Sequence, residues 1–185
     1  IIPTIEKIIS RNGKIILISH LGRPKGKIDE NLSLKIMVPH IEERLKKNII
    51  FCKDDIFSSK TEEKIRRLPP KGVILLENIR FYKQEEENDI KFAKKLSEYG
   101  DIFINESFST SHRNHASITG ISSFLPCFPG KLLENEIKNL NVITKDLNQS
   151  NSVAILGGSK ISTKVNIIDN LAKKFNKVLI GGAMA

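Results

Sequence analysis

The stretch of sequence that decides the fold is DIFINESFSTSHRNHAS, residues 101–117. Its opening residues, 101–105, are apolar and partly β-branched and follow a Gly100–Asp101 turn signal, which is typical of a short buried strand. From Asn105 to His115 the chain is polar and has no helical apolar period. A buried strand that runs into a polar loop bearing Arg and His indicates a site at the carboxyl end of a parallel sheet. A solvated loop whose side chains cap the next helix fits this stretch equally well.

Apolar strands alternate with amphipathic helices along the rest of the chain. Strands are predicted over residues 14–19, 49–53, 72–78, 101–105, 153–158 and 177–182. Helices are predicted over residues 3–11, 33–47, 61–68, 89–99, 131–146 and 161–175, with irregular structure at 78–89 and 125–130. This alternation favours an α/β fold with a doubly wound, mostly parallel (Rossmann-like) sheet that helices cover on both faces.

Cationic side chains follow the ends of separate predicted strands. His20 and Arg23 come after strand 14–19, Arg80 after strand 72–78, and His112 with Arg113 after strand 101–105. Because parallel strands present their carboxyl ends at one edge, we expect these side chains to converge there. The planar fork of Arg suits paired contacts with phosphate or carboxylate oxygens, so the pattern predicts an anion site.

Two alternatives stand beside that hypothesis. Each Arg could pair with a nearby carboxylate, for instance Arg80 with Glu85 or Glu86, and so have a structural role only. The spacing of His112 and His115 could suit two metal ligands, but no third ligand is near in sequence, so no metal site is predicted.

A second region, VAILGGSKISTK at residues 153–164, reads as strand, Gly-Gly turn and helix. Glycines at a strand end let a ligand approach the backbone, and a helix N-terminus favours an anion. Lys160 and Lys164 are predicted in the first turns of that helix, four residues apart and therefore on one face. Lysines oppose the helix dipole there, so we expect a bound polyphosphate; the Walker pattern GxxxxGK[ST] is absent.

The composition predicts a soluble globular protein with anionic partners. Of the 185 residues, 39% are hydrophobic and 28% charged, and the net charge is +9. A basic nucleic-acid-binding protein is an alternative, but the lysines are scattered over predicted polar helix faces and no stripe with interleaved aromatics stands out. No apolar run reaches the ~20 residues of a membrane span. The chain opens without Met inside a helical pattern, and we expect it to be a piece of a longer protein.

The two cysteines, Cys52 and Cys127, are far apart and form no CxxC motif. Neither a disulfide framework nor a zinc site is predicted from them. A reducing, cytoplasmic location fits this usage.

Several motifs together resemble the phosphoglycerate kinase family in order and spacing: ILISHLGRPKG, LLENIRF, INESFSTSHRNHAS, VAILGGSKISTK and LIGGAMA. The resemblance spans the whole chain. It implies a phosphoglycerate-binding domain over residues 1–130, a long interdomain helix over 131–148 and the start of a nucleotide-binding domain over 149–185. It also implies reversible phosphoryl transfer between 1,3-bisphosphoglycerate with ADP and 3-phosphoglycerate with ATP, by a glycolytic and usually monomeric enzyme that uses Mg²⁺ with the nucleotide.

The same resemblance implies roles for individual residues. The implied phosphoglycerate-binding residues are His20, Leu21, Gly22, Arg23, Arg80, His112 and Arg113. The implied nucleotide-binding residues are Gly158, Ser159, Lys160 and Lys164. Lys160, which matches the lysine that follows the transferring phosphoryl group, and Arg23 are implied in catalysis. The magnesium ligands are expected outside this chain.

The chain departs from the family's usual NDAFGTAHRAHAS at Glu106, Ser107, Ser109, Ser111 and Asn114, and Ala183 stands where a third Gly is common. We expect these changes to tune the site. The family's opening strand and most of its nucleotide domain are absent from the sequence, so the isolated chain is expected to be inactive. A non-catalytic nucleotide- or phosphate-binding module is the alternative function.

Overall fold

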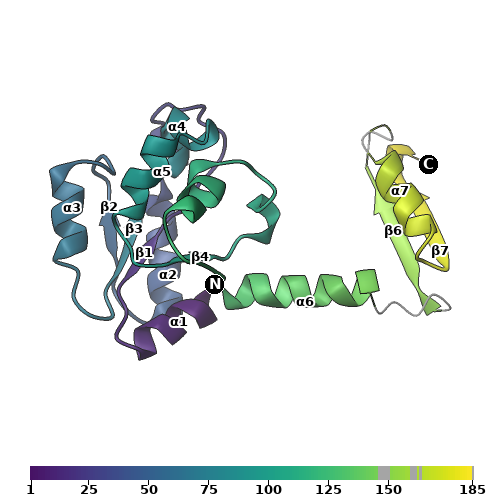
Figure 1. Cartoon of the computed structure of the whole chain (residues 1–185), viewed down its shortest axis with the longest axis horizontal. Helices are drawn as coiled ribbons and strands as arrows, with labels where there is room; N and C mark the ends of the chain where they lie inside the picture. The colour runs from purple at the N-terminus through teal and green to yellow at the C-terminus, as the bar shows by residue number, and fades with distance from the viewer. Residues whose placement is uncertain (146–150, 159–161, 163, 185) are drawn as a thin grey trace. The chain divides into compact units, whose positions relative to one another are not determined.

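The computed structural model describes residues 1–145, 151–158, 162 and 164–184 (Figure 1). The chain divides into two compact units, Ile1–Glu134 and Asn135–Ala185, and each is described by itself. The division falls inside helix α6 (Lys131–Lys145), whose first turn belongs to the first unit.

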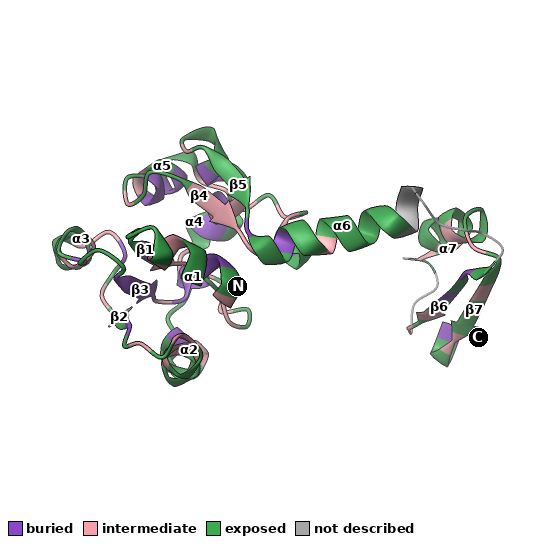
Figure 2. Cartoon of the chain, turned by 90° about the horizontal axis from the view of Figure 1, so that it is seen from below, coloured by how far each residue is buried: buried purple, intermediate pink, exposed green. Residues whose placement is uncertain are grey.

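The core of the first unit is a parallel sheet in the order β1-β3-β2. It consists of β1 (Ile15–Leu17), β3 (Val73–Leu76) and β2 (Ile50–Cys52), which pair in register from Ile15↔Val73 and Ile50↔Ile74. β3 is buried along its whole length (Figure 2). Its near-continuous apolar run is what a strand covered on both faces requires.

Successive residues of β3 point into different cores because strand side chains alternate. Ile74 and Leu76 pack with Phe92 and Leu96 of α5 (Ile90–Ser97), whereas Val73 and Leu75 pack with Ile5 of α1 (Ile2–Ser10). Partly buried residues of α3 (Ser59–Arg66) and α2 (Val38–Leu45) join the first and second core respectively. Helices therefore cover both faces of the sheet, which confirms the predicted α/β, Rossmann-like class.

A second parallel pair joins β4 (Phe103–Asn105) to β5 (Cys127–Pro129). The prediction of irregular structure over 125–130 was therefore wrong. Pro129 lacks an N–H, but β5 is an edge strand of this two-stranded sheet, where proline is tolerated. The ladder is closed on either side by Phe103 N–H, which donates to the Pro126 carbonyl at 2.9 Å, and Gly130 N–H, which donates to the Asn105 carbonyl at 2.8 Å.

Two further segments differ from the predicted elements. Residues 33–47 divide into a 3₁₀ turn, Leu34–Met37, and α2, because Pro39 occupies the first turn of a helix and cannot lie inside one. Residues 78–89, predicted as a loop, hold a 3₁₀ turn, Ile79–Phe81, and the short helix α4 (Lys83–Glu86). The remaining short turns of this unit are Glu30–Leu32, Phe108–Thr110, the π-helical Ala116–Gly120 and Ile121–Ser123.

In the second unit, β6 (Val153–Gly157) pairs in parallel with β7 (Lys177–Gly181). Helix α7 (Val165–Ala172) connects them, and the 3₁₀ turn Gly182–Met184 follows β7. This strand–helix–strand unit was predicted, although α7 starts later than the predicted helix over 161–175.

Candidate functional site

Asn78 ties together the loops that leave β3 and β1. Its side chain is fully buried, and its amide Nδ2 donates to the carbonyl oxygens of Leu21 at 2.8 Å and Leu32 at 2.9 Å. Its Oδ1 accepts a hydrogen bond from the Arg80 backbone N–H at 3.1 Å. A buried amide group without hydrogen-bond partners is costly. These contacts therefore fix the carboxyl ends of β1 and β3 against each other.

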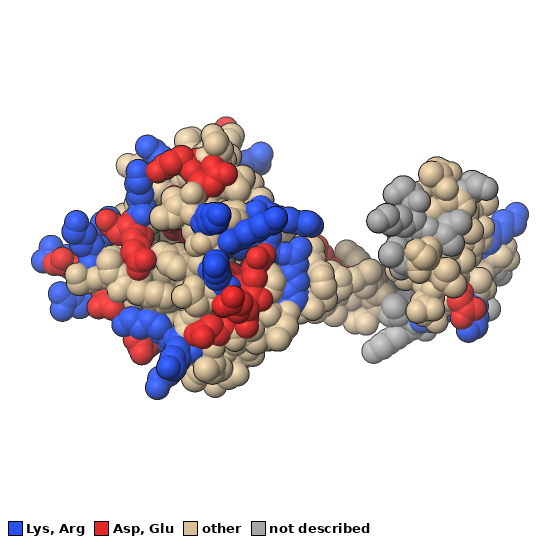
Figure 3. Space-filling view, turned by 90° about the horizontal axis from the view of Figure 1, so that it is seen from above, with Lys and Arg blue, Asp and Glu red and all other residues tan. Residues whose placement is uncertain are grey.

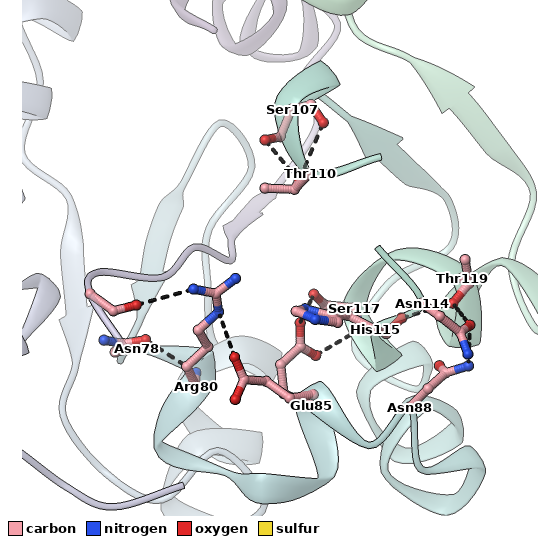
Figure 4. Close-up of polar contacts among 12 residues, drawn as sticks. Asn78, Arg80, Glu85, Asn88, Ser107, Thr110, Asn114, His115, Ser117 and Thr119 are labelled. Carbon is pink, nitrogen blue, oxygen red and sulfur yellow. Dashed lines mark hydrogen bonds and ion pairs between the residues drawn. The ribbon is translucent and has the colours of Figure 1, made fainter. Parts of the chain in front are cut away.

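Arg80 is held between those loops with only 4% of its surface exposed. Its Nη1 donates to the Gly22 carbonyl oxygen at 3.1 Å, and its Nε lies 3.6 Å from Glu86 Oε1 (Figure 4). Its Nη2 is buried and has no hydrogen-bond partner among the described residues. A buried guanidinium with an unused N–H group has capacity for one more oxygen acceptor. Two carboxylates, Glu85 and Glu86, could have paired with Arg80. Glu86 does so at the long distance of 3.6 Å, whereas Glu85 binds Ser117.

Gly22, whose carbonyl receives Arg80, has a positive φ of 64°. A Cβ built on it would lie 2.7 Å from Leu32 Cδ2, so a side chain at this position would need both strain and repacking. The positive φ and the close approach of Leu32 explain why glycine occupies this position in the loop after β1.

His20 shows that the loop after β1 lies near the loop after β4. Burial, followed by the nearby charges of Arg113 and His115, lowers the pKa of His20 below 6.5, whereas Glu86 acts in the opposite direction. Groups from three separate segments therefore share one electrostatic neighbourhood. Both loops contribute cationic or potentially cationic side chains to it, a surrounding in which an anion is favoured.

The remaining predicted residues of this unit are more open. Arg23 and His112 are exposed, whereas Leu21 and Arg113 are half-buried. The structure thus places His20 under the influence of Arg113 and of Glu86, the ion-pair partner of Arg80, and it leaves Arg23 and His112 exposed.

The loop after β4 is braced by its own polar side chains. Asn105 Oδ1 accepts from Ser107 N–H at 2.9 Å, and Asn105 Nδ2 donates to Ser111 Oγ at 2.9 Å. Ser111 Oγ donates to the Ser107 carbonyl at 2.8 Å. Thr110 Oγ1 donates to Ser107 Oγ at 2.9 Å (Figure 4). Ser107 and Ser111, two of the serines that depart from the usual family pattern, therefore hold the loop that carries Arg113.

Glu106 caps helix α6, a role that the sequence interpretation did not assign to it. Its Oε2 accepts hydrogen bonds from the backbone N–H groups of Leu132 at 3.0 Å and Leu133 at 3.2 Å. A carboxylate at this helix end satisfies free N–H groups and complements the dipole. The alternative interpretation of the polar loop, that its side chains cap the next helix, is thus correct for this one residue.

Glu85 is a second residue that sequence reasoning missed as part of the site. It is 2% exposed, and its carboxylate accepts from Ser117 N–H at 2.9 Å and from Ser117 Oγ at 2.6 Å. His115 Nδ1 lies 3.6 Å from Glu85 Oε1. Burial raises the pKa of Glu85, while the hydrogen bonds from Ser117 and the nearby His115 act to lower it. The run Glu85–Glu87 was the available signal, but nothing in it identified Ser117 as the partner.

In the second unit, the side chain of Lys164 reaches the end of β6. Its Nζ donates to the Gly157 carbonyl oxygen at 2.5 Å, next to Gly158, which has a φ of 154°. Helix α7 begins at Val165, so Lys164 precedes the helix and was wrongly predicted inside its first turns. Lys160 and Ser159 lie outside the described residues.

The described residues offer no ready metal centre, since no three of their His, Cys, Asp or Glu side chains form a group that could hold a metal ion. None of the described helices is long and apolar enough to cross a membrane. On the face drawn in Figure 3, Lys and Arg alternate with Asp and Glu over the first unit. Such a mixture differs from the single-sign stripe typical of nucleic-acid binders.

An open hollow of about 670 Å³ lies at the opposite end of the strands, where β2 and β3 begin. Its lining residues include Glu42, Lys46, Ile50, Gly72 and Val73. Ligands of doubly wound sheets bind at the carboxyl edge, so we place the candidate site with Arg80 and not in this hollow.

The comparisons with known proteins agree on one family. A family model described as phosphoglycerate kinase matches residues 1–185. Among curated proteins, the chain is similar to the phosphoglycerate kinases of Coprothermobacter proteolyticus and Wolbachia pipientis, with 43% identity over 183 and 184 residues respectively. These alignments cover 99% and 100% of this chain but 46% of each relative, so the chain spans about half their length.

Solved structures give the same result. The structure of phosphoglycerate kinase from Coxiella burnetii is similar with a TM-score of 0.76 and 34% identity, over 98% of this chain and 45% of that one. The phosphoglycerate kinase from Pyrococcus horikoshii is similar with a TM-score of 0.84 and 28% identity, over 97% of this chain and 46% of that one.

Proposed function

Because the chain belongs to the phosphoglycerate kinase family, we propose that the protein carrying it catalyses phosphoryl transfer between 1,3-bisphosphoglycerate with ADP and 3-phosphoglycerate with ATP. The observation that carries the proposal is Arg80, a buried guanidinium whose Nη2 has no hydrogen-bond partner among the described residues and whose ion-pair partner Glu86 also acts on His20. A phosphate or carboxylate oxygen of phosphoglycerate is the kind of acceptor that this arrangement favours.

The proposed phosphoglycerate-binding residues come from the loops after β1, β3 and β4. The exposed side chains of Arg23 and His112 remain free to reach a ligand, while Arg80 is held in place before it arrives. The full proposed set is His20, Leu21, Gly22, Arg23, Arg80, His112 and Arg113.

The proposed nucleotide-binding residues lie after β6, where a Cβ on Gly158 would clash with the Lys164 ammonium nitrogen. They are Gly158, Ser159, Lys160 and Lys164. Lys164 now donates to a carbonyl oxygen, so polyphosphate oxygens would offer its ammonium a charged acceptor in exchange. Lys160 and Arg23 are proposed to stabilise the charge of the transferring group.

The residues fit the chemistry of the proposed reaction. The carboxylate of 3-phosphoglycerate is ionised at pH 7, so no general base is required to activate it. The protein's task is to hold the two substrates in line and to balance the charge on the equatorial phosphoryl oxygens. Arg, His and Lys serve that task. Mg²⁺ would neutralise nucleotide phosphates. The described residues include no group of His, Cys, Asp or Glu side chains that could hold it.

We propose the same division of labour along the chain as the resemblance implies. Residues 1–130 would bind phosphoglycerate, 131–148 would form the interdomain helix and 149–185 would begin the nucleotide-binding domain. The described helix α6 over Lys131–Lys145 supports the second assignment. A monomeric, cytoplasmic enzyme is proposed from the family's glycolytic role.

The test is the 3-phosphoglycerate-dependent consumption of ATP by the full-length protein that carries this chain. Turnover that is lost in an Arg113→Ala variant supports the proposal. Nucleotide binding without turnover would favour a non-catalytic module instead. The isolated 185-residue chain is expected to be inactive, because catalysis requires both phosphates to be held in line.

A further inference from the structure

Glu85 is a buried carboxylate that the proposed phosphoryl transfer does not use. It lies on the short helix α4, yet its carboxylate accepts hydrogen bonds from Ser117, 32 residues further along the chain. Burying a carboxylate is costly unless its partners compensate for the lost water. Its neighbour Glu86 faces Arg80 instead, so consecutive residues of α4 contact the loops after β3 and after β4.

Glu85 fixes the start of the π-helical turn Ala116–Gly120. The Ser117 N–H belongs to the first turn, where helical N–H groups lack internal partners. The carbonyl oxygen of the preceding His115 accepts from the N–H groups of Ile118, Thr119 and Gly120 at 2.9–3.2 Å. The turn therefore holds the His115 carbonyl, and Glu85 holds the backbone two residues later, at Ser117.

A second contact from the same region holds the other side of His115. Asn88, two residues after α4, donates from Nδ2 to Asn114 Oδ1 at 2.8 Å, and Thr119 Oγ1 donates to the same oxygen at 2.7 Å (Figure 4). Asn114 and His115, which follow Arg113, therefore both contact residues of the 83–89 region.

The geometry also orients the His115 ring. Its Nδ1 lies 3.6 Å from the Glu85 carboxylate, and its side chain retains 15% exposure. His115 also influences His20, which is on the loop after β1. The imidazole therefore lies between a buried carboxylate and the cationic neighbourhood of the candidate site.

We propose that Glu85 is a positioning residue that holds Arg113 and His115 in the geometry required to bind phosphoglycerate. The inference rests on the proposed function. A residue that only stabilised the core would lower the apparent kcat through the amount of folded protein and would leave both KM values unchanged. A positioning residue should affect the KM for 3-phosphoglycerate selectively.

The test compares Glu85→Gln with Glu87→Gln in the full-length enzyme. Glutamine keeps an acceptor for Ser117 and removes the charge that faces His115, while Glu87 is an exposed neighbour that undergoes the same chemical change. We expect Glu85→Gln to raise the KM for 3-phosphoglycerate roughly 10- to 100-fold, the scale of a charge-assisted hydrogen bond. The KM for ATP should stay within about twofold, and Glu87→Gln should match the wild type.

Ser117→Ala provides a second variant if Glu85→Gln fails to fold. It removes one donor to Glu85 but keeps the carboxylate and the backbone contact, so we expect a rise of about three- to tenfold in the same KM. An unchanged KM for 3-phosphoglycerate in either folded variant would overturn this inference alone, as would equal losses for both substrates. A wild-type enzyme without 3-phosphoglycerate activity would overturn the proposed function and this inference with it.

Discussion

Arg80 Nη1 donates a hydrogen bond to the carbonyl oxygen of Gly22, 3.1 Å away and 58 residues earlier in the chain. The contact joins the loop after β3 to the loop after β1 without any ligand. Since the guanidinium is already ordered, a ligand that binds it does not have to immobilise this long side chain. Preorganisation of this kind favours binding.

The Asn78 amide is expected to be the main structural support of that arrangement. Asn78→Ala removes both hydrogen bonds to the loop carbonyls of Leu21 and Leu32, and it leaves those carbonyls unpaired. We expect a loss of about 2–4 kcal/mol in the free energy of unfolding, from two or three buried hydrogen bonds. Urea denaturation measures it. A loss below about 0.5 kcal/mol, the scale of a neutral surface change, would show that these bonds are not supporting the fold.

The two tyrosines should resist ionisation in the folded chain. Burial raises the pKa of Tyr82 and of Tyr99 to about 12. Tyr82 accepts from Ile56 N–H at 3.0 Å, and the hydroxyl of Tyr99 donates to the Ile56 carbonyl.

The folded state therefore holds these phenol protons more tightly than the unfolded state, whose tyrosines titrate near 10. Their contribution to stability is present below pH 10 and is lost as the pH rises through about 12. Between those values, the tyrosinate absorbance should be small in the native chain and large after unfolding in urea. A native titration centred on the ordinary value would contradict the buried environment.

The alternation of apolar strands and helices was sufficient to predict the sheet and the edge to which Arg80 belongs. The expectation that His20 and Arg113 converge at that edge stays a prediction, because β4, which precedes Arg113, pairs with β5 in a sheet separate from β1, β3 and β2. Strand β5 was missed because the apolar part of residues 125–130 is short and includes prolines, and its pairing with β4 is a tertiary contact.

Partners that are distant in sequence were also not predictable. Nothing local links Glu85 to Ser117, or Glu106 to the first amides of α6. The pattern at Lys164 suggested a helix, but α7 begins one residue later, at Val165.

His20 should take up protons when phosphoglycerate binds. Its pKa lies below 6.5 in the free protein, because of burial and the charges of Arg113 and His115, with Glu86 opposing them. A bound anion near this group favours the imidazolium, so its pKa rises and protons are absorbed at a pH near 6.5. Calorimetry in buffers of different ionisation enthalpy measures the uptake. His20→Gln should reduce it, and equal uptake in both proteins would remove His20 from the site.

The lysines after β6 should affect different kinetic parameters in the full-length enzyme. Lys160→Ala should lower kcat by about 10²–10³, the loss expected for one group that stabilises developing charge. Lys164→Ala should mainly raise the KM for ATP, because we propose that it holds the nucleotide in the ground and transition states alike. Steady-state kinetics on both variants separate these effects. A near-wild-type kcat for Lys160→Ala would exclude it from catalysis.

The most direct test of the anion site is a calorimetric titration of 3-phosphoglycerate into the full-length protein and its Arg80→Lys variant, without nucleotide. Lysine keeps the charge but lacks the planar guanidinium. In Arg80, one nitrogen of that group, Nη1, contacts Gly22, and the other, Nη2, has no hydrogen-bond partner among the described residues. The exposed substitution Arg44→Lys on α2 is the matched control. We expect the Kd to rise at least about tenfold for Arg80→Lys, as for a lost charge-assisted contact, and to stay unchanged for Arg44→Lys. Equal Kd values for the wild type and a folded Arg80→Lys variant would contradict the proposed site.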